Sequence, residues 1–131
     1  MNPQHPEELD WVKIRFECTV NQVFEKLHLE VKSDVERINS LQPTREFKIQ
    51  RFGDYFSVFQ EGVLVGPRAV TFKREQMSIE VTTHIRSNNS KDPVIATIVV
   101  NDFGKCCLRV DDKERSFWQF RKDTLEPLFF G

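Results

Sequence analysis

The sequence has almost no excess charge of either sign. Nineteen basic and twenty acidic side chains leave a formal net charge of −1 over 131 residues. Proteins that bind nucleic acid or anionic membranes through bulk charge carry a clear surplus of Lys and Arg. We therefore expect neither a nucleic acid nor a membrane as a partner.

Long apolar runs are also missing. No stretch approaches the roughly 18 apolar residues of a transmembrane helix. The chain does not open with a basic segment followed by an apolar one, which is the pattern of a secretory signal peptide. Together these absences predict a cytoplasmic protein.

Histidine, cysteine and glycine are scarce, with three, three and five residues. The histidines stand far apart, and no Cys or carboxylate lies at zinc-ligand spacing from them, so we expect no metal site. Five glycines leave little room for a phosphate-binding loop, and the sequence contains no nucleophile-elbow or zinc-protease motif. We expect no cofactor and favour a non-enzymatic protein.

Two of the three cysteines, Cys106 and Cys107, are adjacent. Neighbouring residues of a strand point to opposite faces of the sheet, so this arrangement does not suggest a conventional disulfide framework. For these two residues and Cys18 we predict reduced thiols in the core, as is usual in the cytosol.

One strong helical pattern is present, from Val20 to Leu41. At about 100° per residue its apolar side chains fall within an arc of roughly 120°, as in a helix with one buried face. Thr19 and Gln22 form a capping-box pattern at its start, and Pro43 ends it because a residue before proline leaves the helical conformation. The stripe consists of Val20, Val23, Phe24, Leu27, Val31, Val35, Ile38 and Leu41.

Residues 11–18, before this helix, alternate between apolar and polar side chains. A period of two is typical of a half-buried strand. The alternative is a single helix running from Glu8 to Leu41. We favour the strand because the capping box at Thr19 supplies a separate start for the helix.

The chain after Pro43 reads as short strands separated by turns, followed by a short helical turn at Leu125–Phe130. The sequence therefore predicts one α+β domain, residues 1–131, with a long helix on a curved, mainly antiparallel sheet of about six or seven strands, in the order β-α-β-β-β-β-β-β. This order resembles the helix-on-curved-sheet arrangement of cystatin-like folds. The expected strands are 46–52, 55–60, a bent edge strand made of 63–65 and 69–73, 77–85, 94–100, 105–110 and 117–120.

Three titratable residues are candidates for binding a ligand. Asp34 falls inside the apolar arc of the long helix, where a carboxylate needs a partner, and Arg37, three residues on, is a near neighbour on the helix surface. Glu80 and His84 share the polar face of one predicted strand, so they can line a common surface or simply face solvent.

Surplus apolar surface suggests a protein partner. The strand Val94–Val100 is apolar on both faces, and one helix covers only one face of a sheet. Either the C-terminal segment or a second subunit covers the other, with Leu29, Leu128, Phe129 and Phe130 as candidate interface residues. Two functions follow: a non-catalytic interaction or scaffolding domain that forms a homodimer, which we favour, or a protein with a pocket for a small molecule.

Overall fold

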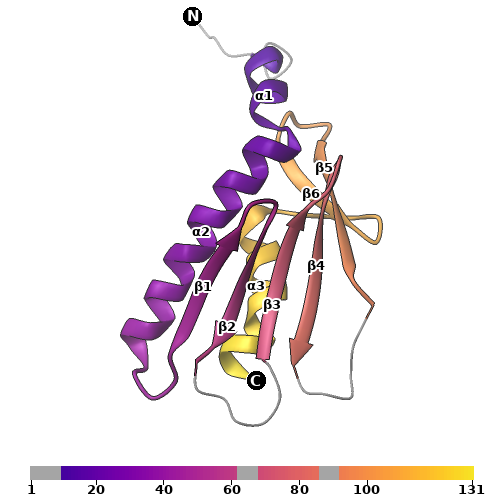
Figure 1. The fold of residues 1–131 in the computed structure, drawn as a ribbon. Coiled ribbons are helices and arrows are strands. Elements are labelled where there is room, and N and C mark those ends of the chain that lie inside the picture. The colour runs from indigo at the N-terminus through magenta and orange to yellow at the C-terminus, as the bar shows by residue number, and fades with distance from the viewer. Residues whose placement is uncertain (1–9, 62–67, 86–91) are drawn as a thin grey trace, which may run out of the picture.

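In the computed structural model, which describes residues 10–61, 68–85 and 92–131, seven strands form one antiparallel sheet (Figure 1). Each strand pairs with the next one in the chain, so the sheet is a simple meander from β1 to β7. The strands are β1 (Phe47–Phe52), β2 (Tyr55–Gln60), β3 (Arg68–Arg74), β4 (Ser78–Ile85), β5 (Val94–Val100), β6 (Cys106–Val110) and β7 (Lys113–Arg115).

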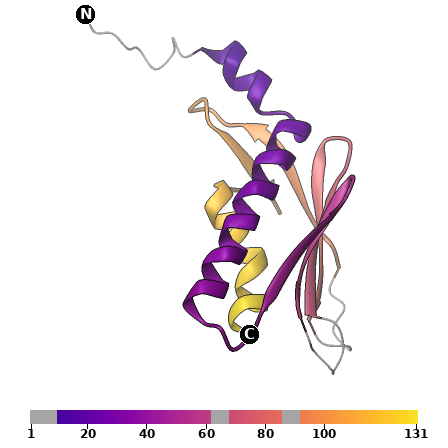
Figure 2. The ribbon, with the colours of Figure 1, turned by 60° about the vertical axis from the view of Figure 1, so that its left-hand side comes forward.

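The two long helices, α2 (Val20–Leu41) and α3 (Phe117–Phe130), lie on the same face of this sheet, as Figure 2 shows. They run side by side in the same direction: the Lys26 ammonium lies over the Phe117 ring, and one helical turn further along Arg121 reaches the carboxylate of Glu30. A single apolar core fills the space between the helices and the sheet. Its largest fully buried side chains are Phe24, Phe47, Phe56, Phe72 and Phe120.

The structure confirms the long helix predicted from the sequence. Thr19 caps it by accepting a hydrogen bond from the Gln22 amide at 3.3 Å. Six residues of the predicted stripe are buried, whereas Leu41, at the end of the helix, is exposed. In the last turn of the helix, the side chain of Asn39 both donates to the Phe47 carbonyl and accepts from the Phe47 amide, each at 2.9 Å, which ties the helix to the start of β1.

The strand predicted at residues 11–18 is wrong, because Trp11–Glu17 form a short helix, α1. Asp10 caps this helix by accepting from the Lys13 amide at 3.1 Å. No residue of α1 is buried, so its alternating pattern does not reflect a sheet face. Val12 and Phe16 are four residues apart, a spacing that also fits one side of a helix, and a strand without a neighbour would leave its backbone groups unpaired.

The strand predicted at residues 117–120 is also wrong, because Phe117 begins the 14-residue helix α3. Ser116 and Gln119 form a full capping box there, in which each side chain bonds the backbone of the other residue. Pro127 lies inside α3 and not in a first helical turn. The chain therefore runs through two helices, seven strands and a final helix. The resemblance to a cystatin-like order depended on an initial strand, so it no longer holds.

The second piece of the predicted bent edge strand, residues 69–73, is part of β3. This strand is not at an edge, because it lies inside the sheet between β2 and β4. The first piece of the predicted edge strand, residues 63–65, lies outside the described residues. Among the helices of the described part of the chain, none is long and apolar enough to cross a membrane.

The second face of the sheet is not covered by the C-terminal segment. In β5, Ala96 is fully buried under the helices, whereas Ile95 on the opposite face is 47% exposed. The uncovered face is also partly polar, and the hydroxyls of Ser57 and Thr71 lie 2.7 Å apart across β2 and β3. Within the described residues, coverage of the second face by the C-terminal segment is therefore wrong, whereas coverage by a second subunit stays a prediction.

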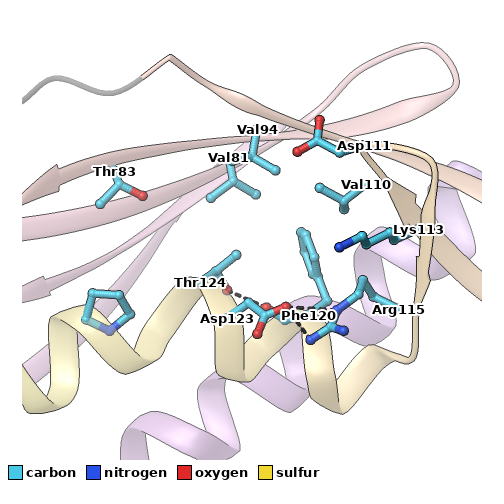
Figure 3. Close-up of a pocket in the computed structure, with 11 residues that line it drawn as sticks. Val81, Thr83, Val94, Val110, Asp111, Lys113, Arg115, Phe120, Asp123 and Thr124 are labelled. Atoms are coloured by element: carbon cyan, nitrogen blue, oxygen red, sulfur yellow. Dashed lines mark hydrogen bonds and ion pairs between the residues drawn. The ribbon is translucent and has the colours of Figure 1, made fainter.

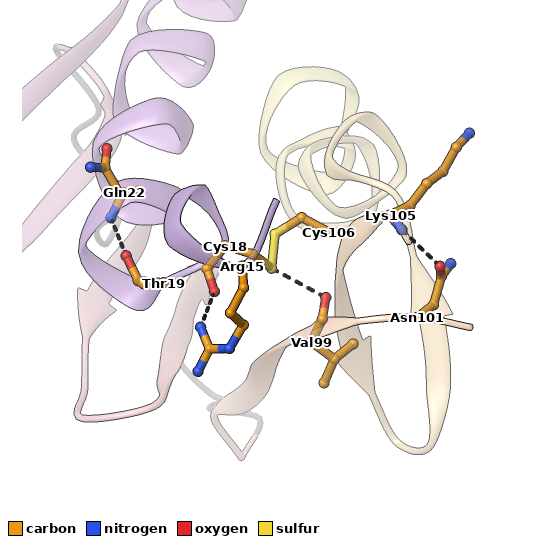
Figure 4. The surroundings of a disulfide bond; sticks show 8 residues. All are labelled: Arg15, Cys18, Thr19, Gln22, Val99, Asn101, Lys105 and Cys106. Carbon is orange, nitrogen blue, oxygen red and sulfur yellow. Dashed lines mark hydrogen bonds between the residues drawn. A yellow bond between two sulfur atoms is a disulfide. The ribbon is translucent and has the colours of Figure 1, made fainter. Parts of the chain in front are cut away.

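The prediction of three reduced thiols is contradicted by a disulfide between Cys18 and Cys106 (Figure 4). Their Cα atoms are 5.5 Å apart, although 88 positions separate them in sequence. Adjacency of two cysteines on a strand prevents them from pairing with each other, but it leaves each free to pair with a distant residue. The bond joins the α1–α2 junction to β6, and Cys107 remains a free, buried cysteine.

Candidate functional site

A cleft of about 620 Å³ opens between α3 and the strands β4 to β7, and Figure 3 shows the side chains around it. It lies on the helix-covered side of the sheet, toward the β7 edge and away from α2. The residues that line it are Val81, Thr83, Val94, Val110, Asp111, Lys113, Arg115, Phe120, Asp123, Thr124 and Pro127.

One wall of the cleft is a face of α3. Phe120, Thr124 and Pro127 are spaced by four and three residues, so they lie along one side of the helix. The Thr124 hydroxyl donates to the Phe120 carbonyl at 2.9 Å, and this bond inside the helix occupies its proton. Val81 and Val94, which are register partners in β4 and β5, line the facing sheet. Most of the cleft is therefore apolar.

The polar end of the cleft is built by the tight turn between β6 and β7. Asp111 and Asp112 form this turn with positive φ angles of 51° and 64°. Positive φ at both central positions is the geometry of a two-residue hairpin turn whose twist matches the strands. The turn pairs Val110 with Lys113, and Leu108 with Arg115, so the side chains of Lys113 and Arg115 project to the helix side of the sheet.

The four charged groups at this end are not equivalent. Arg115 is paired with Asp123: its Nε lies 2.9 Å and its Nη2 lies 2.7 Å from the same carboxylate oxygen. This pair joins β7 to α3 and neutralises both charges. Lys113, by contrast, makes no ion pair with any residue in the described ranges, and Figure 3 shows its side chain pointing into the cleft. Asp111 contributes a carboxylate at the sheet side.

The structure does not bring the three ligand-binding candidates from the sequence together. Glu80 and His84 lie on the uncovered face of the sheet, opposite Lys73 and Ala69 on β3. Asp34 lies on the helix side of the sheet, and none of the three lines the cleft beside α3.

Asp34 has a partner, but it is not the Arg37 expected from helical spacing. The Nε of Arg121, on α3, lies 2.7 Å from a carboxylate oxygen of Asp34, and the same guanidinium lies 3.0 Å from Glu30. All three side chains are partly buried between the two helices. The carboxylate inside the apolar arc is therefore explained by a contact between helices.

The four interface candidates divide into two groups. Leu128 and Phe129 are buried in the core of the chain itself, and the Phe129 ring lies 5.0 Å from that of Phe47. Leu29 and Phe130 are on the surface, 65% and 72% exposed. For these two residues an interface stays a prediction.

The titratable groups with shifted pKa values lie away from the cleft. Two hydrogen bonds of 2.6 Å from Arg51 hold the pKa of Glu25 below its ordinary value. Burial and the positive charge of Arg51 lower the pKa of His28, whose ring packs edge-on against Phe56. These groups join α2 to the first strands, and their shifts follow from that packing. The described residues contain no group of three side chains suited to holding a metal ion.

Sequence reasoning missed the cleft residues because it placed the start of the last helix too late. Ser116 and Gln119 match the capping-box pattern, which is the signal that marks the true start of α3. With that start, Phe120, Thr124 and Pro127 fall on one helical face. Pairing across the Asp111–Asp112 turn would then place Lys113 near them.

No protein-family model matches the chain, and no curated protein or solved structure shows significant similarity to it.

Proposed function

We propose that this protein is a non-catalytic binding domain whose cleft beside α3 holds a small, mainly apolar molecule. The observation that carries the proposal is the cleft itself, at about 620 Å³. Small-molecule sites commonly measure a few hundred to about 1,000 Å³ and combine apolar walls with a few well-placed polar groups. Here the charged groups lie at one end, and Thr83 contributes a hydroxyl at the other.

Binding, and not chemistry, is what the charges at the polar end favour. Arg115 and Asp123 bond to each other across β7 and α3. Because each of these two side chains bonds the other, their charged groups are engaged within the fold. This pair is suited to fixing the shape of the cleft, which leaves Lys113 and Asp111 to contact a ligand.

A neutral fluorescent probe, N-phenyl-1-naphthylamine, tests the proposal by titration. We expect saturable binding that Val94→Trp weakens at least tenfold, because an indole at this half-exposed position fills the cleft. Ile95→Trp is the matched control, since Ile95 is the next residue of β5 and faces the opposite side of the sheet. Equal effects of the two substitutions, or no saturable binding by the unmodified protein, would rule out this cleft as the site.

Self-association through the α1 end of the molecule is the second candidate function. Trp11, Val12 and Phe16 on α1 are all more than half exposed, and so is Phe103 in the turn between β5 and β6. The two segments are neighbours, because Ile14 of α1 and Gly104 of the turn line one shallow cleft. Large apolar side chains gathered at one end are typical of protein-binding surfaces.

Sedimentation equilibrium distinguishes the homodimer from a monomer. We expect a dimer that Phe16→Ser together with Phe103→Ser dissociates, while Leu41→Ser, a change of the same kind at the far end of α2, leaves it intact. A monomer at all concentrations would refute self-association. Dissociation by Leu29→Ser alone would move the interface to α2.

A cytoplasmic location remains a proposal, and the disulfide between Cys18 and Cys106 counts against it. Structural disulfides are common in oxidising compartments and rare in the cytosol. Trapping free thiols in intact cells with an alkylating reagent tests the location directly: three alkylated cysteines per chain support the cytosol, and one supports an oxidising compartment.

A further inference from the structure

We propose that the natural ligand of the cleft is an anionic amphiphile, a molecule with a carboxylate or similar acidic head and an apolar body, and that Lys113 selects the head. This inference rests on the proposed binding function and specifies the chemical class of the ligand. It adds a charge preference that neither the apolar walls nor the size of the cleft requires.

The two cationic side chains of the cleft differ in whether their charge is balanced. Arg115 and Lys113 both line the cleft, but the charge of Arg115 is balanced by Asp123 at 2.7 Å. Lys113 has no such counter-charge among the described residues and points into the cleft (Figure 3). Lys113 itself is exposed, but the apolar body of a bound ligand would displace water from its ammonium and so strengthen the attraction to an anionic head.

The apolar part of the cleft is elongated along α3. The wall formed by α3 runs from Phe120 to Pro127, seven residues and therefore about 10 Å at 1.5 Å per residue. Val81 and Val94 face this wall from the sheet, and Lys113 lies at the β7 end (Figure 3). A ligand that fits both features has a short apolar chain or ring system with its charge at one end.

Asp111 is the residue that opposes this assignment. Its carboxylate also lines the cleft and would repel an anion or attract a cation. In Figure 3, however, it lies at the sheet side, beyond Val110, whereas the Lys113 ammonium extends into the space between the walls. Asp111 and Lys113 are both exposed, so water and salt screen the two charges alike, and the assignment depends on the direction of the Lys113 side chain.

Three probes with the same apolar chain and different heads test the inference: octanoate, 1-octanol and octylamine. The affinity of each probe is measured by its displacement of N-phenyl-1-naphthylamine from the cleft at pH 7 and low salt. We expect octanoate to bind at least tenfold more tightly than 1-octanol, and octylamine to bind most weakly. Lys113→Met should abolish the preference for octanoate without changing the affinity for 1-octanol, and Lys113→Arg should largely restore it.

The control variant is Lys48→Met, which removes an exposed lysine from the uncovered face of the sheet, and it should leave all three affinities unchanged. If none of the three probes binds, the proposed small-molecule function fails. If 1-octanol or octylamine binds as tightly as octanoate, or if Lys113→Met preserves the preference, the cleft remains a binding site but the inference about an anion is overturned.

Discussion

Loss of the bond between Cys18 and Cys106 should destabilise the fold more than most single substitutions would. The bond closes a loop across 88 positions of the sequence, and it joins the first helices to the sixth strand. In the unfolded chain, a crosslink of this span removes conformational entropy worth about 4.6 kcal/mol at 25 °C. Domains of this size are stable by only about 5–15 kcal/mol, so the bond accounts for a large fraction of the total.

The assay compares urea unfolding of the oxidised protein with that of the double variant Cys18→Ala, Cys106→Ala. We expect the free energy of unfolding to fall by about 3–5 kcal/mol, and the thermal midpoint to fall by roughly 10–17 °C for a chain of this length. Cys107→Ala is the control, because it removes a buried thiol without touching the crosslink. It should cost about 1 kcal/mol, as a small cavity does.

Thiol counting removes the main ambiguity in this experiment. Alkylation in denaturant without a reductant should modify one cysteine per chain, Cys107, and pretreatment with a reductant should raise the count to three. Three modified cysteines without reductant would show that the bond is absent. One modified cysteine with no loss of stability in the double variant would refute the entropy argument itself.

Two further predictions concern α2 and its partners. Arg121→Met should lower the free energy of unfolding by about 1 kcal/mol in denaturant titrations, because it removes the partly buried guanidinium that pairs with Asp34. Arg37→Met, an exposed change on α2, should have less than half that effect. Burial and Arg51 depress the pKa of His28 below 6.5, so its contribution to stability is fully present above pH 6.5 and is lost as pH falls toward its folded pKa. His28→Gln should flatten urea midpoints measured between pH 7.5 and 5, and an unchanged pH profile would contradict the prediction.

The parts of the fold that the sequence predicted are those with local and redundant signals. The bounds of α2 follow from an apolar stripe of eight residues, which agrees with the cap at Thr19 on the start and with Pro43 on the end. Strands β1, β2, β4 and β5 are marked by apolar side chains between turn residues. In all of these elements, neighbouring residues carry enough information to fix the structure.

The parts that failed have short patterns with two readings. Val12 and Phe16 satisfy both a period of two and a spacing of four, so seven residues do not decide between a strand and α1. Phe117 to Phe120 is a short aromatic run of the same kind, and only the cap at Ser116 reveals the helix. The disulfide and the cleft depend on contacts between distant segments, which no local pattern specifies.

The turn between β6 and β7 connects the fold to the proposed site. Two positive φ angles in succession are met most easily by Asn-Gly, because Gly carries no side chain to clash, yet this chain places Asp111 and Asp112 there. Asp tolerates this conformation, but less readily than Gly. The turn therefore departs from the best local choice at the point where it sets the register that carries Lys113 and Arg115 to the cleft.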